Sequence, residues 1–229
     1  MVVTIDGPSG AGKSTVSRRL ARELGFAFLD TGALYRGVAL GAQWDELDLS
    51  DLPVLEAWLT KLELSAHLQG GSFQVLLAGR DIEPFIRNEE IASLASQLSA
   101  LGPVRAHLLT LQRQAGEQGD LVAEGRDMGT VVFPQAQLKI FLTAEVAERA
   151  RRRYLELKPS RPELTPDQVR ADLDQRDQRD QGRSLSPLLP AAEAHIVDTT
   201  HLGLEDVVAL LARMVRAVQS GADPAKESL

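Results

Sequence analysis

The residues Gly7-Pro8-Ser9-Gly10-Ala11-Gly12-Lys13-Ser14 match G-x-x-x-x-G-K-[ST], the pattern of a phosphate-binding loop. Before them, Val2–Ile5 form a short apolar, β-branched run that is typical of a buried parallel strand. After them, apolar residues recur at helical spacing from Val16 to Leu24, and Gly25 can end the helix. Because the motif needs a strand before it and a helix after it, this context predicts a true phosphate-binding loop. The alternative is a glycine-rich turn that matches the pattern by chance.

The chemistry of the loop follows from its residue types. Gly7, Gly10 and Gly12 let the backbone curl so that its N–H groups point inward at anionic oxygens. A helix that begins near Lys13 adds its positive end to the same site. We expect Lys13 to reach β- and γ-phosphates and Ser14 to bind Mg²⁺.

Composition narrows the class of protein. The chain has 229 residues, 44% of them hydrophobic and 25% charged, which suits one globular domain. Its net charge of −7 excludes an overall basic field for a nucleic-acid polymer, so an anionic substrate must be held by a local cluster of arginines. Cysteine is absent, which excludes disulfides, and the histidines show no metal-ligand spacing. The chain shows no secretory signal and no apolar run of about 18 residues, so we expect a soluble cytoplasmic protein without a membrane partner.

Short apolar segments separated by helical stretches predict an α/β fold with a parallel sheet, as βαβ crossovers require. Ligands of open α/β sheets bind beyond the carboxyl ends of the strands. Each segment ends at a polar or small residue, and these residues mark the expected site: Asp6, Asp30, Glu124, Thr143 and Asp198. The segments themselves are residues 2–5, 27–29, 121–123, 138–142 and 195–197.

Residues 62–90 break this rhythm. Residues 62–68 alternate at period two, Gln69-Gly70-Gly71-Ser72 can form a turn, and Phe73–Leu77 follow. The pattern predicts an antiparallel hairpin inserted into the α/β core. Residues 158–162 are expected to form a mobile loop, and residues 221–229 a frayed, flexible tail after a single domain over 1–220.

Charge interrupts the apolar face of one predicted helix. Thr165-Pro166-Asp167-Gln168 is a good helix start with a capping box. The face that begins with Val169 and Leu173 continues, at spacings of three and four, to Arg176, Asp180 and Arg183. This face is either the wall of a site or a solvated surface with ion pairs such as Arg176–Asp180.

A second apolar stripe is interrupted in the same way. It runs from Ile91 to Leu101, with Ser96 near its end, and Gly102-Pro103 then start a new helix. Arg105 falls where the stripe would continue. A buried arginine there needs an anionic or acceptor partner, whereas a surface arginine only snorkels.

Further charged segments follow predicted strands. Glu124–Thr130 contains Gly125 and Gly129, which permit close approach of the backbone to a ligand. Asp30–Arg36 brings Thr31 and Arg36 to the same edge of the sheet. Arginines crowd residues 149–153 and repel one another unless an anion visits. A structural ion-paired loop at 124–130 and a basic exposed turn at 149–153 are the alternatives.

Together these segments resemble the bacterial cytidylate kinases, a branch of the nucleoside monophosphate kinases. The resemblance spans about residues 2–216 and rests on residues 5–14, 30–36, 125–134 and 176–183. Many kinases share the first motif, whereas the other three together are much more specific. The resemblance implies a P-loop kinase fold with a five-stranded parallel sheet, a monophosphate-binding insert at about 62–90 and a short lid at about 150–165. It also implies ATP-dependent phosphorylation of CMP or dCMP with Mg²⁺, and we expect a monomer.

The resemblance implies roles for individual residues. The implied ATP-binding residues are Gly7, Pro8, Ser9, Gly10, Ala11, Gly12, Lys13, Ser14 and Thr15. Those around cytosine are Thr31, Ser96, Arg105 and Asp127, those on the acceptor phosphate are Arg36, Arg126 and Arg183, and those on the sugar are Arg176 and Asp180. The groups that stabilise the transferring phosphoryl are Lys13, Arg126, Arg183 and the lid arginines Arg149 and Arg153. The chain departs from the family in having Thr31 where serine is common and Glu124 where aspartate is expected, so which carboxylate orders the magnesium waters stays open.

The chemistry of the base agrees with these roles. A carboxylate such as Asp127 accepts from the 4-amino group of cytosine, and Arg105 can donate to N3 and O2. Uracil reverses the polarity at these positions, so CMP should be preferred about tenfold to a hundredfold. Two alternatives remain: a kinase for shikimate, dephospho-coenzyme A or another monophosphate, and a GTP-dependent switch. The switch predicts an Asn-Lys-x-Asp signature, which the sequence lacks.

Overall fold

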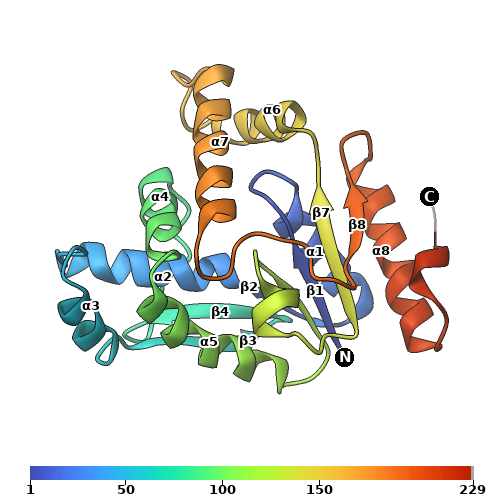
Figure 1. Cartoon of the computed structure of the whole chain (residues 1–229), viewed down its shortest axis with the longest axis horizontal. Coiled ribbons are helices and arrows are strands. Elements are labelled where there is room, and N and C mark those ends of the chain that lie inside the picture. The colour runs from blue at the N-terminus through green and yellow to red at the C-terminus, as the bar shows by residue number, and fades with distance from the viewer. Residues whose placement is uncertain (228–229) are drawn as a thin grey trace.

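A mostly parallel sheet runs through the molecule and carries a hairpin at one edge (Figure 1). The computed structural model describes residues 1–227, and within them the strand order is β3-β4-β2-β6-β1-β7-β8, with β5 beside β4. The parallel strands coincide with the predicted segments, which confirms the α/β fold. They are β1 (Val2–Asp6), β2 (Ala27–Asp30), β6 (Leu121–Glu124), β7 (Leu138–Thr143) and β8 (His195–Asp198).

The order of the strands places the site. β1 lies between β6 and β7, with Val3 opposite Val122 on one side and Leu138 on the other. The chain leaves β1 toward β2 and leaves β6 toward β7, so the two connections run in opposite directions. Such a reversal opens a crevice at the carboxyl ends of the strands, and here it falls between β1 and β6.

Helices cover both faces of the sheet because its buried strands alternate their side chains between two cores. Phe28 of β2 belongs to the core formed with α1 (Lys13–Leu24) and α8 (Leu204–Gln219). Leu29 belongs to the opposite core. That core is formed with α2 (Thr31–Trp44), α3 (Leu52–Leu59), α4 (Glu89–Leu98) and α5 (Gly102–Gly116).

The predicted hairpin is present, and it extends the main sheet. β3 (Leu64–Gln69) and β4 (Ser72–Leu77) pair antiparallel, and the short β5 (Arg80–Asp81) follows. Gly70 and Gly71 form the turn with φ of 58° and 81°, as a two-residue turn of this type requires. β4 joins β2 through the pair Phe28–Ser72.

A pair of helices, α6 (Val146–Leu157) and α7 (Pro166–Gly182), lies at the top of the view in Figure 1. The two helices share a small core of their own, formed by Ala150, Leu164, Val169 and Leu173. The predicted capping box at Thr165 is confirmed, and residues 158–165 between the helices are irregular. The π-helical turn η1 (Met128–Val132) follows β6.

The chain ends beside α8. The short turn η2 (Pro224–Lys226) contacts α8, and Arg213 Nε of α8 lies 3.4 Å from Glu227 Oε2. Residues 228–229 of the predicted tail lie outside the described residues. Within residues 1–227, no helix is both long enough and apolar enough to cross a membrane.

Candidate active site

The phosphate-binding loop connects β1 to α1 and is shaped by glycines. Gly12 precedes the helix with φ of 85°, and Gly7 adopts φ of 147°. A Cβ on Gly7 would lie 2.0 Å from the carbonyl oxygen of Leu142, so a larger residue would displace the loop. Lys13 donates from Nζ to the carbonyl oxygen of Pro8 at 2.7 Å. Burial, and then the charge of Arg126, lower the pKa of Lys13 to about 7, so an anion beside it would restore its charge.

A second loop follows β6 and is tied to the first by one carboxylate. Asp6, the last residue of β1, accepts hydrogen bonds from the backbone N–H groups of Met128 and Gly129, both at 2.8 Å. Burial raises the pKa of Asp6 to about 6, although these two hydrogen bonds lower it. Asp6 therefore connects the loop that follows β1 to the loop that follows β6.

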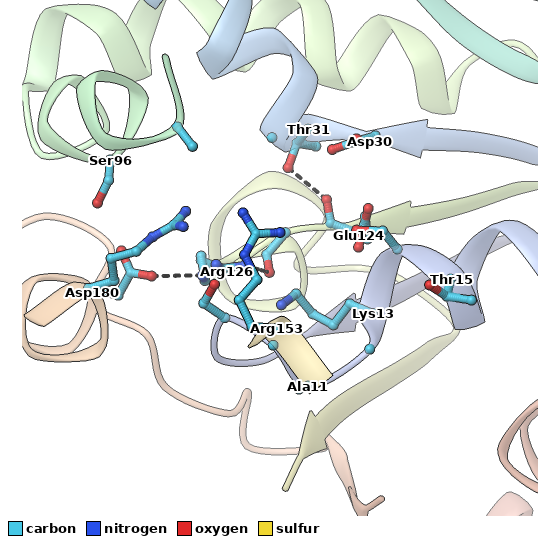
Figure 2. Close-up of a pocket in the computed structure, with 18 of the residues that line it drawn as sticks. Ala11, Lys13, Thr15, Asp30, Thr31, Ser96, Glu124, Arg126, Arg153 and Asp180 are labelled. Atoms are coloured by element: carbon cyan, nitrogen blue, oxygen red, sulfur yellow. Dashed lines mark hydrogen bonds and ion pairs between the residues drawn. The ribbon is translucent and has the colours of Figure 1, made fainter. Parts of the chain in front are cut away.

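Glu124 lies between the two loops and faces Lys13 (Figure 2). Both of its carboxylate oxygens are buried, and neither has a hydrogen-bond partner within residues 1–227. Burial, and then the charge of Asp30, raise the pKa of Glu124 to about 7, while the charge of Lys13 lowers it. The backbone carbonyl of Glu124 accepts from Thr31 Oγ1 at 2.7 Å, which fixes the start of α2 against β6. Buried carboxylate oxygens beside Ser14 are suitable hydrogen-bond acceptors for the waters that surround Mg²⁺.

Arg105 and Asp127 form an ion pair at the acceptor end of the site. Arg105 also donates to the carbonyl oxygen of Ser99 at 3.1 Å and lies over the ring of Tyr35, 5.8 Å from its centre. Burial raises the pKa of Asp127, while Arg105 lowers it. Ser96 Oγ is buried nearby and has no hydrogen-bond partner in the part of the chain that the structure describes. These groups together offer an acceptor, a forked donor and a free hydroxyl.

The charged face of α7 turns toward the crevice. Asp180 accepts from Arg126 Nε at 2.8 Å (Figure 2), and within residues 1–227 the alternative ion pair Arg176–Asp180 is not present. Burial acts to raise the pKa of Asp180, but Arg126, Arg183 and Arg176 together lower it below its usual value. Burial and the charge of Arg126 lower the pKa of Arg176 to about 10. Arg183 donates to Ser99 Oγ at 3.2 Å, and its buried Nη2 lies 3.9 Å from Asp180 Oδ1.

A single cavity of about 720 Å³ collects most of the predicted site residues. Its walls include Ser9, Gly10, Ala11, Gly12, Lys13, Ser14, Thr15, Thr31, Arg36, Ser96, Arg105, Arg126, Asp127, Arg153, Arg176, Asp180 and Arg183. The predicted residues that do not line it are Gly7, Pro8 and Arg149. Gly7 and Pro8 form the back of the loop.

The prediction that Arg149 reaches the phosphates differs from the structure. The Arg149 side chain is buried and pairs with Asp177 of α7 at 2.6 Å. It also donates to the carbonyl oxygens of Ala144 and Ser9, each at 3.0 Å. Its Nε and Nη1 donors are used within the protein, so Arg149 joins the phosphate-binding loop to α6 and α7. Arg153, the other predicted lid arginine, does line the cavity and pairs with Glu89 of α4 and Glu156.

The structure adds cavity residues that sequence reasoning missed. Tyr35 and Ser99 both lie beside Arg105. Both could have been predicted, because Tyr35 belongs to the 30–36 motif and Ser99, the residue after α4, is one helical turn beyond Ser96. Arg87 lines the cavity from the segment between β5 and α4, and no sequence signal marked it.

The fold and the site define a P-loop kinase that brings a second small molecule to the phosphates. The family model for cytidylate kinase matches residues 3–217. Relatives named cytidylate kinase include one from Syntrophotalea carbinolica, 45% identical over 227 residues, covering 99% of this chain and 97% of its own. Another, from Pseudomonas syringae pv. syringae, is 46% identical over 209 residues, covering 90% and 91%. The chain belongs to the cytidylate kinase family. A solved shikimate kinase from Bacteroides thetaiotaomicron is also similar over 94% of this chain and 98% of its own, but its identity of 12% and TM-score of 0.47 carry no functional argument.

Proposed function

We propose that this protein transfers the γ-phosphate of ATP to CMP or dCMP, giving ADP and CDP or dCDP. The observation that carries the proposal is that one cavity joins the phosphate-binding loop to the pair Arg105–Asp127. The first feature binds a triphosphate, and the second can recognise cytosine. Family membership and the names of the relatives agree with this assignment.

Base recognition follows from the polarity of the pair. Asp127 accepts a hydrogen bond from the 4-amino group, and Arg105 donates to N3 and O2. Ser96 Oγ, which lacks a partner, offers a further hydrogen bond to the nucleoside. Uracil presents a carbonyl at position 4 and an N–H at N3, so it leaves like groups facing one another. Each unpaired buried group costs about 1–3 kcal/mol, which favours CMP over UMP.

Phosphoryl transfer then depends on position and charge more than on covalent work by the protein. Arg36, Arg126 and Arg183 hold the acceptor phosphate, and Lys13 holds the donor phosphates. The charge of Arg126 lowers the pKa of Lys13, so the two cations act on the same part of the cavity and stabilise negative charge that develops between the substrates. No general base is needed, because a phosphate monoester is largely ionised near pH 7.

The residues present also suit Mg²⁺ bound with ATP. The Ser14 hydroxyl would hold the ion, and the unpartnered oxygens of Glu124 would accept from its waters. The ion would supply charge neutralisation at the β- and γ-phosphates. Arg153 on α6 and the insert at residues 62–90 would close over the substrates and exclude water, which otherwise competes as the acceptor.

The test is a coupled assay of ADP release with CMP, dCMP, UMP, AMP and shikimate as acceptors. We expect turnover with CMP and dCMP, and a kcat/KM for UMP lower by about tenfold to a hundredfold. Equal turnover with UMP or AMP would contradict base recognition by Arg105 and Asp127. Turnover with shikimate alone would assign the cavity to a different acceptor.

A further inference from the structure

We propose that Ser99 is a positioning residue, whose hydroxyl holds the guanidinium of Arg183 in place for phosphoryl transfer. The inference rests on the proposed function, in which Arg183 binds the acceptor phosphate, and extends it to a residue outside the sequence motifs. Ser99 directly follows α4 and is buried, yet it lines the cavity. The acceptor half of the site therefore contains a hydroxyl that is attached to the end of a helix.

The Ser99 hydroxyl makes two hydrogen bonds with different partners. It donates from Oγ to the carbonyl oxygen of Ser96, one helical turn earlier, at 2.8 Å. Because a hydroxyl has a single hydrogen, Oγ can act toward Arg183 only as an acceptor. Arg183 Nη1 donates to this oxygen at 3.2 Å, and to the backbone carbonyl of Ser99 at 3.5 Å. The hydroxyl thus supplies the shorter of the two hydrogen bonds between Arg183 and Ser99.

The C-terminal ends of two helices meet at this serine. Ser99 is the C-cap residue of α4, and Arg183 is the C-cap residue of α7. The carbonyl groups that end a helix carry partial negative charge and need donors. The Ser99 carbonyl accepts from Arg105 Nη1 at 3.1 Å as well as from Arg183. The end of α4 therefore holds the arginine proposed for the base beside the arginine proposed for the acceptor phosphate.

The contact with Ser99 fixes Arg183 without neutralising its charge. A hydroxyl carries no charge, so it does not compete with a phosphate as a carboxylate would. Arg183 Nη2 lies 3.9 Å from Asp180 Oδ1, which is too far for a hydrogen bond. Burial lowers the pKa of Arg183 and the charge of Arg105 lowers it further, although Asp180 acts in the opposite direction. A phosphate beside Arg183 would offset both of the lowering effects.

Removal of the hydroxyl should affect the transfer step more than the binding of either nucleoside. An arginine side chain that is not held samples several rotamers, and phosphoryl transfer depends on the position of such charges. Arg105 keeps its hydrogen bond to the Ser99 carbonyl, which a substitution of the side chain does not remove. We therefore expect Ser99→Ala to lower kcat with CMP by about tenfold, with the dissociation constants of ATP and cytidine unchanged.

A purely structural role for Ser99 predicts a different result. If the hydroxyl only completes the end of α4 by donating to Ser96, Ser99→Ala lowers the melting temperature, and any effect on kcat does not depend on Arg183. If the hydroxyl positions Arg183, its removal has no further effect once Arg183 is gone. A double-mutant cycle of Ser99→Ala with Arg183→Met separates the two roles.

The experiment measures kcat and KM for CMP by coupled ADP release, at saturating ATP and well below the melting temperature. The proteins are the wild type, Ser99→Ala, Arg183→Met and the double variant, and calorimetry gives their dissociation constants for ATP and cytidine. The matched control is Ser93→Ala, because Ser93 is an exposed serine of α4 and does not line the cavity. We expect kcat to be about tenfold lower in Ser99→Ala than in the control, and equal in Arg183→Met and the double variant.

Two outcomes would overturn the role of Ser99. One is a wild-type kcat in Ser99→Ala. The other is a loss of kcat that recurs at the same size in the Arg183→Met background, because the hydroxyl would then act independently of Arg183. A wild type that binds ATP but does not phosphorylate CMP would overturn the proposed function itself, and the role of Ser99 with it.

Discussion

Replacing Asp127 with alanine removes the carboxylate that faces Arg105 in the acceptor half of the cavity. Asp127 is almost fully buried, so its interactions are made in a poorly solvated site. Hydrogen bonds to a charged group contribute about 1.5–3 kcal/mol, and about 1.4 kcal/mol corresponds to a factor of ten. We therefore expect Asp127→Ala to lower kcat/KM for CMP by roughly 10- to 150-fold. Arg105 keeps its hydrogen bond to the Ser99 carbonyl, so the helix start around it should remain in place.

The reading of the base is tested more sharply by Asp127→Asn. The amide can donate to the 4-carbonyl of uracil, which the carboxylate cannot do. The ratio of kcat/KM for UMP to that for CMP should rise in Asp127→Asn, although both values fall.

The assay is coupled ADP release at saturating ATP, with the dissociation constant of ATP measured separately by calorimetry. Asp172→Ala is the control, because Asp172 is an exposed carboxylate on α7 outside the cavity. An unchanged UMP to CMP ratio in a folded Asp127→Asn protein would refute the assignment of Asp127 to the base.

Other changes test the remaining parts of the site. Arg183→Met removes a buried guanidinium that lines the cavity and should lower acceptor-dependent kcat by about a hundredfold at an unchanged melting temperature; a loss of stability alone would make Arg183 structural. Burial raises the pKa of Glu124 from 4.5 to about 7, so the folded state binds the extra proton and the free energy of unfolding falls as pH rises through this range. Glu124→Gln should flatten that fall in urea titrations between pH 4.5 and 7, and a slope equal to that of the wild type would contradict it. Arg149→Met leaves Asp177 buried without its partner and should lower the free energy of unfolding by about 3–5 kcal/mol, whereas the exposed Arg151→Met should change it little, so equal effects in urea unfolding would count against the buried pair.

The sheet and its helix boundaries could be predicted because they depend on local patterns. β1 and β6 are short apolar runs whose burial needs no long-range information, and Gly25 ends α1 in the left-handed conformation expected of it. The capping box of Thr165 is likewise contained in four consecutive residues. The pairing of the hairpin with β2 was not visible in the sequence, because the contact between Phe28 and Ser72 joins distant segments.

The candidate site was predictable to the extent that motifs carry it. The residues after β1, β2 and β6 meet in one cavity because parallel strands end at the same edge. The partners of individual arginines could not be predicted. Arg149 and Arg153 are one helical turn apart, yet one is buried against Asp177 and the other lines the cavity. That difference depends on how α6 packs on α7, which the spacing of charges does not contain.

The hydrogen bonds of Asp6 have a consequence for how this molecule can move. The Asp6 side chain at the end of β1 accepts hydrogen bonds from the turn that follows β6. The loop after β1 and the turn after β6 therefore cannot move apart without breaking both hydrogen bonds. The distance between the site of the phosphate donor and the site of the acceptor is then fixed by the pairing of β1 with β6, before any ligand binds. We expect motion instead in the insert at residues 62–90 and in the helical pair α6 and α7, which has a core of its own and can tilt as one piece. Substitutions that disturb α6 and α7 should admit water and increase ATP hydrolysis. Substitutions that disturb Asp6 should instead misalign the reacting atoms.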